Sequence, residues 1–438
     1  MRIKKVSAKF ILLIFLFSIF PSLHAKKLYL NRKNNIVIED TSKPFSSYTW
    51  LVAHNAYSND NIFSNQYGLP VSELLKYGVR GLMLDLYDYE NSIYLCHKSC
   101  YFSNYGKFFE TVSYSVIPFL RNNPREVVTI FLEDHSSRSM LEQELAKIQG
   151  LEEFLFNPSV WAEYKQWPSL EELIQKNQRL VIITDNKRNS GYYEINGKEI
   201  HLIFGPDLTV ENYWSLGDTY LSHNYACVSR WPEIPLSTKK SSYFYNQWER
   251  LVVMNQFHGI PFYPHSTSDN KFKALFTREQ KYCLPETEKM PNYVAVDNVT
   301  SGDAKEYVQW LNSGGILFYK DLTFDTENLI CGFSIVESGS SDLNKFRCDQ
   351  PIRSIKINRL KEGTIIRIFD KSYKFQNSEY VELTMKKDMS DTEEFKIDLE
   401  NYNFENSYYK YIYYGKKLDK KTFQKIEVIV SYAQEKKL

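Results

Sequence analysis

GVRGLMLDLYD (residues 78–88) and EVVTIFLEDHSS (residues 126–137) are the two stretches that decide the fold of this chain. Each contains an apolar run followed by acidic residues. This pattern is typical of strands that are buried on both faces and end at a polar edge of the sheet. Similar strand-length runs occupy residues 48–54, 180–185, 251–256 and 293–297. Helix-like segments follow several strands, at residues 70–77, 107–122, 139–149, 169–176 and 304–312. This alternation predicts a parallel sheet, and the number of units favours a closed barrel over an open sheet.

The pattern changes from about residue 322. Short alternating stretches such as SIKINRL (354–360), GTIIRIFD (363–370) and KIEVIVSYA (425–433) follow one another with turn residues between them. Such spacing is typical of a small β-sandwich. We therefore predict three parts: a signal peptide over residues 1–25, an α/β barrel over 26–321 and an all-β module over 322–438.

The first 25 residues resemble an export signal. Basic residues precede an apolar run from Phe10 to about Phe20, and Ala25 offers a cleavage site. Leu23 is large for a position three residues before the cut, which leaves a retained anchor as the alternative. We predict a secreted, periplasmic or cell-surface protein.

Six cysteines in an exported chain favour disulfides over free thiols. Spacing favours the neighbours Cys96 with Cys100 and Cys331 with Cys348, which leaves Cys227 for Cys283. The alternative is a zinc site at Cys96, His97 and Cys100, but no second cysteine pair lies at zinc-finger spacing.

The charges of the chain are balanced. Fifty-four lysines and arginines face 53 acidic residues, for a net charge of +1. This balance gives no electrostatic footprint for a nucleic-acid partner, and the sequence does not predict an oligomeric state.

Polar residues gather at the ends of the predicted strands. His54 and Asn55 follow the apolar run of YTWLVAHNAY, His97 follows that of SIYLCHKSC, and Asp85 and Glu133 follow the apolar runs of the two stretches quoted first. We predict that each of these residues lies at the carboxyl end of a strand of the parallel barrel. Two imidazoles can share one reaction as base and acid. We predict one site at the mouth of the barrel, of the kind that cleaves phosphodiesters.

The ordered set HNAY, GVRGLMLDLYD, LCH, VVTIFLEDHSS, QRLVIITD and NYVAVDN resembles the catalytic X domain of phosphatidylinositol-specific phospholipases C. It is most similar to the secreted or anchored PLC-like phosphodiesterases of plants and microbes. The resemblance covers about residues 45–315 and implies a distorted TIM barrel. It also implies an exported enzyme that cleaves a phosphoinositide or a related glycosyl-phosphate ester through a cyclic phosphate.

The resemblance assigns roles to the two histidines. His54 would act on the attacking hydroxyl, and His97 would protonate the leaving group. Asp297, at the end of the last barrel strand, would fix the tautomer of His54. Arg80, which matches the arginine of the family's G-x-R, would either hold a phosphate oxygen or form a buried ion pair.

A calcium ion is the implied cofactor. Asn55, Asp85 and Glu133 match three oxygen ligands of the metal-dependent members of the family. Met83 stands where another acidic ligand is expected, and a thioether is a poor ligand for calcium. Plant-type relatives share this change, so the resemblance leaves the metal in question.

Two other functions remain open. A glycerophosphodiesterase or sphingomyelinase-like activity could use the same barrel, although those relatives carry a Glu-x-Asp motif after their first histidine. A non-catalytic glycan- or lipid-binding protein is the other alternative, with Met83 as its best support.

Two segments have several interpretations. The aromatic-rich stretch 201–250 is either packed core or, as we predict, a partly buried loop over the barrel mouth. The module after residue 322 is a structural appendage, a carbohydrate-binding unit or a membrane-docking unit, and KKLDKK (416–421) could make a transient contact with anionic lipid.

Overall fold

The computed structural model describes residues 36–101, 103–243, 248–370, 379–399, 402–415 and 423–430. The predicted signal peptide and KKLDKK lie outside these residues. Among the described residues, no helix combines the length and the apolar character that crossing a bilayer requires.

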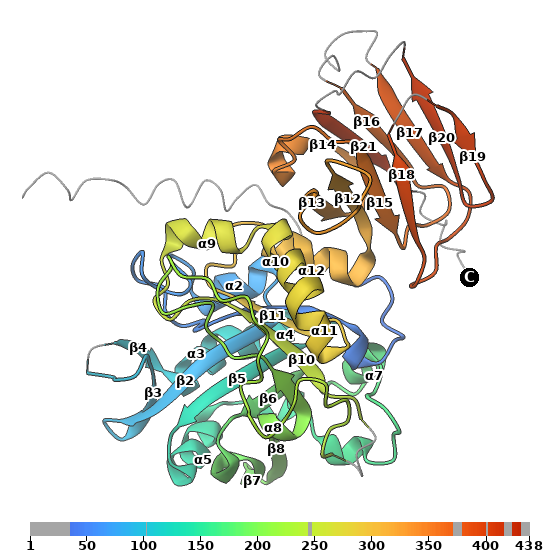
Figure 1. Ribbon diagram of the computed structural model, residues 1–438. Helices are drawn as coiled ribbons and strands as arrows, with labels where there is room; N and C mark the ends of the chain where they lie inside the picture. The colour runs from blue at the N-terminus through green and yellow to red at the C-terminus, as the bar shows by residue number, and fades with distance from the viewer. Residues whose placement is uncertain are drawn as a thin grey trace, which may run out of the picture. The chain divides into compact units, whose positions relative to one another are not determined.

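A large, mainly parallel sheet forms the first part of the described chain (Figure 1). Its parallel strands are β1 (Trp50–Ala53), β2 (Gly81–Tyr89), β5 (Val128–His135), β6 (Leu180–Thr184), β8 (Lys198–Phe204), β9 (Thr209–Glu211), β10 (Leu251–Gln256) and β11 (Tyr293–Val296). All six predicted strands are present. The register pairs Asp85 of β2 with Glu133 of β5, so the two acids lie side by side at one end of the sheet.

The hydrogen-bonded order of this sheet is β8-β6-β5-β2-β1-β11-β10-β9. The strands follow one another in chain order around the sheet, but within the described residues β8 and β9 are not paired with each other. The predicted closed barrel is therefore not found, and the mixed α/β class with a large parallel sheet is. Three further strands pair antiparallel at its margins: β3 (Ser92–Cys96), β4 (Asn104–Lys107) and β7 (Gly191–Ile195).

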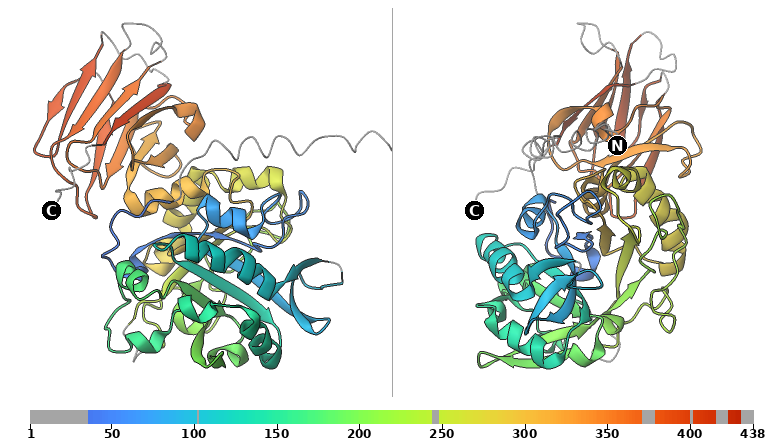
Figure 2. Two further views of the ribbon diagram at one scale, coloured as in Figure 1. Left: turned by 180° about the vertical axis from the view of Figure 1, so that it is seen from behind. Right: turned by 90° about the vertical axis from the view of Figure 1, so that its left-hand side faces the viewer.

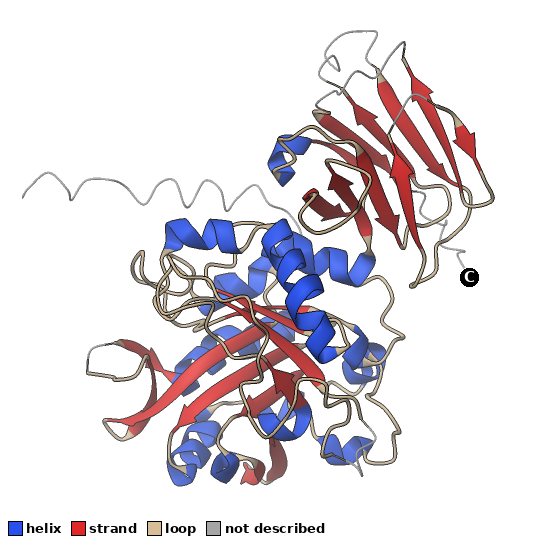
Figure 3. Ribbon diagram, in the orientation of Figure 1, coloured by secondary structure: helices blue, strands red, loops and turns tan. Residues whose placement is uncertain are grey.

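Helices flank the parallel strands (Figures 2 and 3). They are α2 (Val71–Tyr77), α3 (Phe108–Thr111), α4 (Ile117–Asn122), α5 (Arg138–Lys147), α6 (Leu151–Phe154), α7 (Leu170–Gln175), α8 (Gly205–Leu208), α9 (Tyr263–Asp269), α10 (Phe272–Arg278), α11 (Leu284–Thr287) and α12 (Ala304–Ser313). A π-helical turn, Val112–Val116, joins α3 to α4, so the predicted helix over 107–122 is continuous. Ser169 and Glu172 form a capping box at the start of α7.

The second part of the described chain is antiparallel. One sheet has the order β13-β12-β15-β18 and the other β14-β21-β16-β17-β20-β19. The strands are β12 (Gly315–Tyr319), β13 (Leu329–Ser334), β14 (Gly339–Asp342), β15 (Ser354–Asn358), β16 (Ile365–Phe369), β17 (Tyr380–Met385), β18 (Glu394–Asp398), β19 (Phe404–Glu405), β20 (Tyr409–Tyr414) and β21 (Lys425–Ile429).

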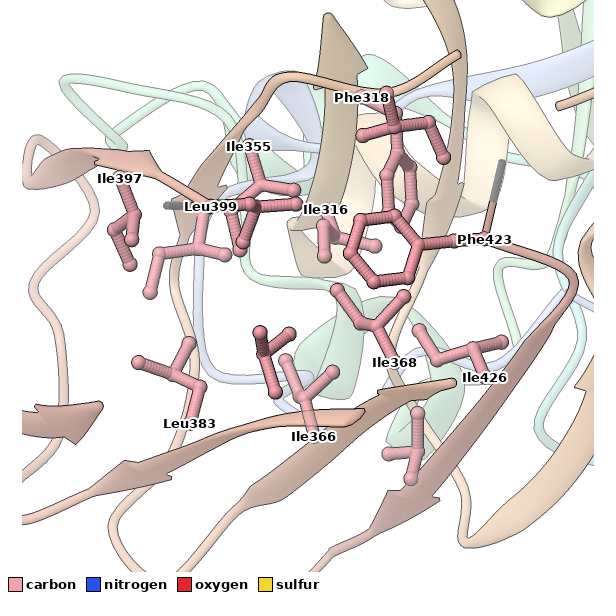
Figure 4. Packing of buried hydrophobic residues seen from close by; sticks show 14 of the residues in the cluster. Ile316, Phe318, Ile355, Ile366, Ile368, Leu383, Ile397, Leu399, Phe423 and Ile426 are labelled. Atoms are coloured by element: carbon pink, nitrogen blue, oxygen red, sulfur yellow. The ribbon is translucent and has the colours of Figure 1, made fainter. Parts of the chain in front are cut away.

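Alternating side chains of these two sheets share one apolar core (Figure 4). Ile316, Ile355, Ile366, Leu383 and Ile426 are all nine-tenths buried or more. The alternation of buried and exposed residues along β17 is what a sheet with one covered face produces. Strand β12 pairs with β13 and β15, so the antiparallel pattern begins at Gly315, before the change at residue 322 that the sequence indicated.

Three disulfides join the six cysteines: Cys96–Cys100, Cys227–Cys283 and Cys331–Cys348. The pairing is the predicted one. Because Cys96 and Cys100 bind each other, they are not available as zinc ligands beside His97.

Candidate active site

A cavity of about 320 Å³ opens where the parallel strands end. Five of the seven predicted site residues line it: His54, Asn55, Asp85, His97 and Glu133. Asp297 lies behind His54, and Arg80 lies elsewhere. Strand direction explains the gathering, because the carboxyl ends of β1, β2 and β5 meet at the same edge of the sheet.

His54 directly follows β1 and is held on three sides. Its Nδ1 lies 2.8 Å from Oδ1 of Asp297, and its ring stacks on Phe257 with the centroids 3.5 Å apart. Asn65 donates to the same Asp297 oxygen at 2.9 Å. Asp297 is 4% exposed, so its carboxylate is desolvated and its contact with the imidazole is strong. This arrangement favours the tautomer with Nδ1 protonated, which leaves Nε2 as a proton acceptor.

His97 is held more loosely. Its Nδ1 lies 3.6 Å from Oδ2 of Asp85 and 3.3 Å from Nδ2 of Asn55, and its side chain is 43% exposed. The sequence prediction that His97 ends a parallel strand is wrong, because β3 pairs antiparallel with β2. A hairpin therefore brings His97 back to the cavity, and the Cys96–Cys100 disulfide brackets its loop.

The three predicted metal ligands lie on the same cavity. Asn55 is 2% exposed and Asp85 4%, whereas the side chain of Glu133 is about half exposed and contacts His135 at 3.1 Å. The backbone of Asn55 has a φ of 41°, a left-handed conformation that asparagine tolerates. Met83, two residues before Asp85 on β2, also lines the cavity. The set offers hard oxygen donors, which suit calcium, beside one soft sulfur, which does not.

Arg80 is a correction to the predicted site. It directly precedes β2, five residues before Asp85, and is 3% exposed. Its Nε donates to Glu126 at 2.7 Å, and its Nη1 donates to the carbonyl oxygens of Leu75 and Val79. Its Nε and Nη1 donors are used inside the fold and Arg80 does not line the cavity, so the buried ion pair is the correct alternative and a phosphate contact is not.

The arginine of the cavity is Arg230. Its Nη2 lies 3.1 Å from Oδ2 of Asp185, and its Nη1 lies 3.1 Å from Oε1 of Glu211. Burial lowers the pKa of Arg230, but the charges of Glu211 and Asp185 outweigh burial and raise it, so the guanidinium stays charged. Burial in turn raises the pKa of Asp185, against the hydrogen bond from Asp134 and the charge of Arg230.

Sequence reasoning missed Arg230, Asn65 and Glu211. Arg230 belongs to the long connection between β9 and β10, which forms neither a helix nor a long strand in its described part. That connection brings Trp214 and Trp231 to the cavity, so the prediction of a partly buried loop is correct for it. The start of the predicted loop, residues 201–211, instead forms β8, α8 and β9.

The family model described as PI-PLC X 1 matches residues 41–312, more than half of the chain. This chain belongs to the PI-PLC X family. A PI-PLC X domain-containing protein of Arabidopsis thaliana is 32% identical over 272 residues, which cover 58% of this chain and 58% of that protein. PI-PLC X domain-containing protein 1 of Arthroderma benhamiae is 24% identical over 35% of this chain and 52% of its own length.

A protein of the same fungus described as an uncharacterized secreted protein is 30% identical over 36% of this chain and 37% of its own length. The matches thus span little more than half of these relatives at most. Among solved structures, the phosphatidylinositol-specific phospholipase C of Listeria monocytogenes aligns with a TM-score of 0.38 and 12% identity, over 62% of this chain and 96% of that one. The family membership gives this chain a PLC-like phosphodiesterase fold.

Proposed function

We propose that this PI-PLC X family member is an exported phosphodiesterase that cleaves a phosphoinositide, or a related glycosyl-phosphate ester, through a cyclic phosphate. One observation carries the proposal: His54 and His97 line one cavity, and Nδ1 of each faces a carboxylate, at 2.8 Å and 3.6 Å. Among the described residues, neither Nε2 atom has a protein partner. Both are therefore available to a substrate.

His54 suits the role of the base. With Nδ1–H donated to Asp297, its Nε2 accepts the proton of the attacking hydroxyl as that oxygen bonds to phosphorus. The imidazolium that forms is stabilised by the buried Asp297 carboxylate. Stacking on Phe257 fixes the plane of the imidazole ring, so the base is already oriented before the reaction begins.

His97 suits the role of the acid. It is the more exposed of the two histidines, and its Nδ1 lies 3.6 Å from Oδ2 of Asp85, which orients the ring. As the bond from phosphorus to the departing oxygen breaks, His97 gives that oxygen a proton, and a cyclic phosphodiester and a free alcohol result. Water would open the cyclic ester with the two roles exchanged.

The charge of the cavity supports a cation. Four carboxylates line it, those of Asp85, Glu133, Asp185 and Glu211, whereas Arg230 and Lys98 are its permanent cations. An anionic phosphate would be repelled by this excess of negative charge. Asn55, Asp85 and Glu133 would hold calcium, which when bound supplies the charge that neutralises the phosphate oxygens.

Two further parts of the proposal concern the fold and the location. We interpret the parallel sheet as a distorted TIM barrel that is open between β8 and β9, because its strands follow chain order. Export is supported by the three disulfides and by the signal-like N-terminal sequence. The substrate would then be a phospholipid, reached by transient contact with a membrane surface.

The test is incubation of the purified full chain with phosphatidylinositol, in calcium and in chelator, followed by phosphorus NMR. We expect a cyclic inositol phosphate with calcium. His54→Ala and His97→Ala should each lower turnover by about 10²- to 10⁴-fold. His265→Gln is the matched control, because His265 does not line the cavity.

Two results would contradict the proposal. Full activity in both single variants would show that neither histidine takes part in the reaction. A linear phosphate formed without a cyclic intermediate would favour the glycerophosphodiesterase or sphingomyelinase-like alternative.

A further inference from the structure

A second cluster of metal-ligating side chains lies beside the cavity. It consists of His223 in the connection between β9 and β10, His258 two residues after β10, and Asp269 at the end of α9. Nε2 of His223 is 2.8 Å from Oδ1 of Asp269, and Nε2 of His258 is 3.2 Å from Oδ2. The three ligand atoms lie within 4.8 Å of one another. Three segments of the chain thus converge on one point.

His258 is the unusual member of the cluster. It is 5% exposed, yet neither of its ring nitrogens has a hydrogen-bond partner among the described residues. Its closest charged neighbour is the carboxylate of Asp269, 3.2 Å from Nε2. Native proteins rarely keep a buried polar atom without a hydrogen-bond partner. A metal ion placed between the three side chains would take Nε2 of His258 as one of its ligands.

We propose that His223, His258 and Asp269 form a zinc site. Two imidazoles and one carboxylate are a common ligand set for zinc, and water can complete the tetrahedron. With Zn–N and Zn–O distances of about 2.0–2.1 Å, neighbouring ligand atoms lie roughly 3.3 Å apart. The two nitrogen-to-oxygen separations in the cluster, 2.8 Å and 3.2 Å, are close to that value.

The site differs in chemistry from the oxygen-lined cavity. Nitrogen ligands favour zinc over calcium, whereas Asn55, Asp85 and Glu133 offer oxygen alone. The proposal does not depend on phosphodiesterase activity, because it rests on the geometry of its own three residues.

Zinc at this place would fasten the loop that shapes the cavity. His223 belongs to the same connection as Trp214, Arg230 and Trp231, all of which line the cavity. The Cys227–Cys283 disulfide ties that connection to the π-helical turn Glu279–Cys283. His258 directly follows Phe257, on which His54 stacks. The ion would thus be a second cross-link of this connection, in addition to the Cys227–Cys283 disulfide, and it would lie close to His54.

The first measurement is the metal content of the untagged full chain, expressed where its disulfides form and dialysed against zinc and then metal-free buffer. We expect one zinc ion per chain by elemental mass spectrometry. Cobalt(II) in place of zinc should give the visible absorption bands of a four-coordinate site with nitrogen ligands. This readout does not require an active enzyme.

Variants locate the ion. His258→Gln and Asp269→Asn should each weaken zinc binding by on the order of 100-fold or more, since the loss of an outer-shell partner alone costs 10- to 100-fold. His265→Gln tests for adventitious histidine binding, and Asp85→Asn tests for zinc in the catalytic cavity. Both should retain the ion and the cobalt bands.

Two outcomes would overturn the proposal. One is a folded wild-type chain that binds no zinc and gives no four-coordinate cobalt spectrum. The other is zinc that Asp85→Asn removes and Asp269→Asn does not, which would place the ion in the cavity. Near-ultraviolet circular dichroism checks that each variant is folded, and the wild-type spectrum decides the case if a variant is not.

Discussion

The interior of the parallel-sheet region (residues 36–314) differs from that of the antiparallel region (residues 315–430) in what it buries. Eleven Asp, Glu, Lys or Arg side chains are buried among the described residues of the first region, against Asp370 alone in the second. The second region has about a third as many described residues, so its size does not explain the difference. Its core consists of Ile, Leu, Val, Met and aromatic side chains together with the Cys331–Cys348 disulfide.

The difference in buried charge suggests that the two cores have different roles. A buried charge is costly unless it is paired, so a chain gains nothing in stability by keeping many of them. In the first region, Asp85 and Glu211 line the cavity, Asp297 contacts His54, and Asp269 contacts His258, which also lines it. The antiparallel region needs only packing. We infer that the buried charged side chains at and beside the cavity are kept for the reaction. The apolar core of the antiparallel region contributes to stability alone.

Asp297→Asn should give the largest effect. An asparagine keeps the shape but no longer enforces the Nδ1-protonated tautomer of His54 or stabilises its imidazolium. We expect kcat to fall by about 10³- to 10⁴-fold with little change in KM. Asp370→Asn, at the buried acid of the antiparallel region, is the matched control and should leave kcat unchanged. Comparable losses in both variants would break the distinction between the two regions.

His201 of β8 should make the stability of the first region sensitive to acid. Its ring is 6% exposed, its Nδ1 has no partner among the described residues, and burial lowers its pKa to about 4. The unfolded chain takes up this proton below pH 6.5, while the folded chain does not until about pH 4. The contribution of His201 is therefore complete above pH 6.5 and is lost as the pH falls towards 4, by about 3 kcal/mol.

His201→Phe should flatten this pH dependence. All seven tryptophans lie at or before residue 310, so tryptophan fluorescence during urea unfolding reports the first region. All eight histidines lie at or before residue 265, so the antiparallel region has no such group. An unchanged slope between pH 4 and 6.5 in His201→Phe would show that another group is responsible.

The sequence predicted the parts of the site that regular strands carry. His54, Asn55, Asp85 and Glu133 end apolar runs, so their place at one edge followed from strand direction. Arg230 and Asn65 could not be found this way, since irregular connections carry them and have no period to read. The sequence identified His97 as a site residue, but it predicted a parallel strand before His97 where the structure has an antiparallel one. An apolar run does not show whether it pairs parallel or antiparallel with its neighbour. Arg80 was ambiguous because a guanidinium suits a phosphate and a carboxylate equally.

The zinc ligands show the same limit. His223, His258 and Asp269 are far apart in sequence and none belongs to a motif. Only the fold brings them together, through the turn after β10 and the connection before it. The missing pairing between β8 and β9 could not be predicted either. The sequence pattern shows which segments are strands along the chain, but it does not show whether β8 and β9 form hydrogen bonds with each other.

Ile366→Val should give the smallest effect and test the antiparallel core. Ile366 of β16 is 1% exposed and pairs with Leu383 and Val428 on its two sides. Removing one methylene from such a site costs about 0.5–1.5 kcal/mol. Hydrogen exchange of β16 should become faster by the corresponding factor, while kcat stays at the wild-type value.

Ile182→Val is the matched change in the parallel sheet, since Ile182 of β6 is equally buried and does not line the cavity. It should lower the urea midpoint that tryptophan fluorescence reports, and Ile366→Val should lower the protection of β16. If Ile366→Val reduced kcat while Ile182→Val did not, the antiparallel core would contribute to the chemistry and the contrast between the two regions would be wrong. Equal stability losses with kcat unchanged in both would mean that a methylene is worth the same in either core, and that only the buried charges distinguish them.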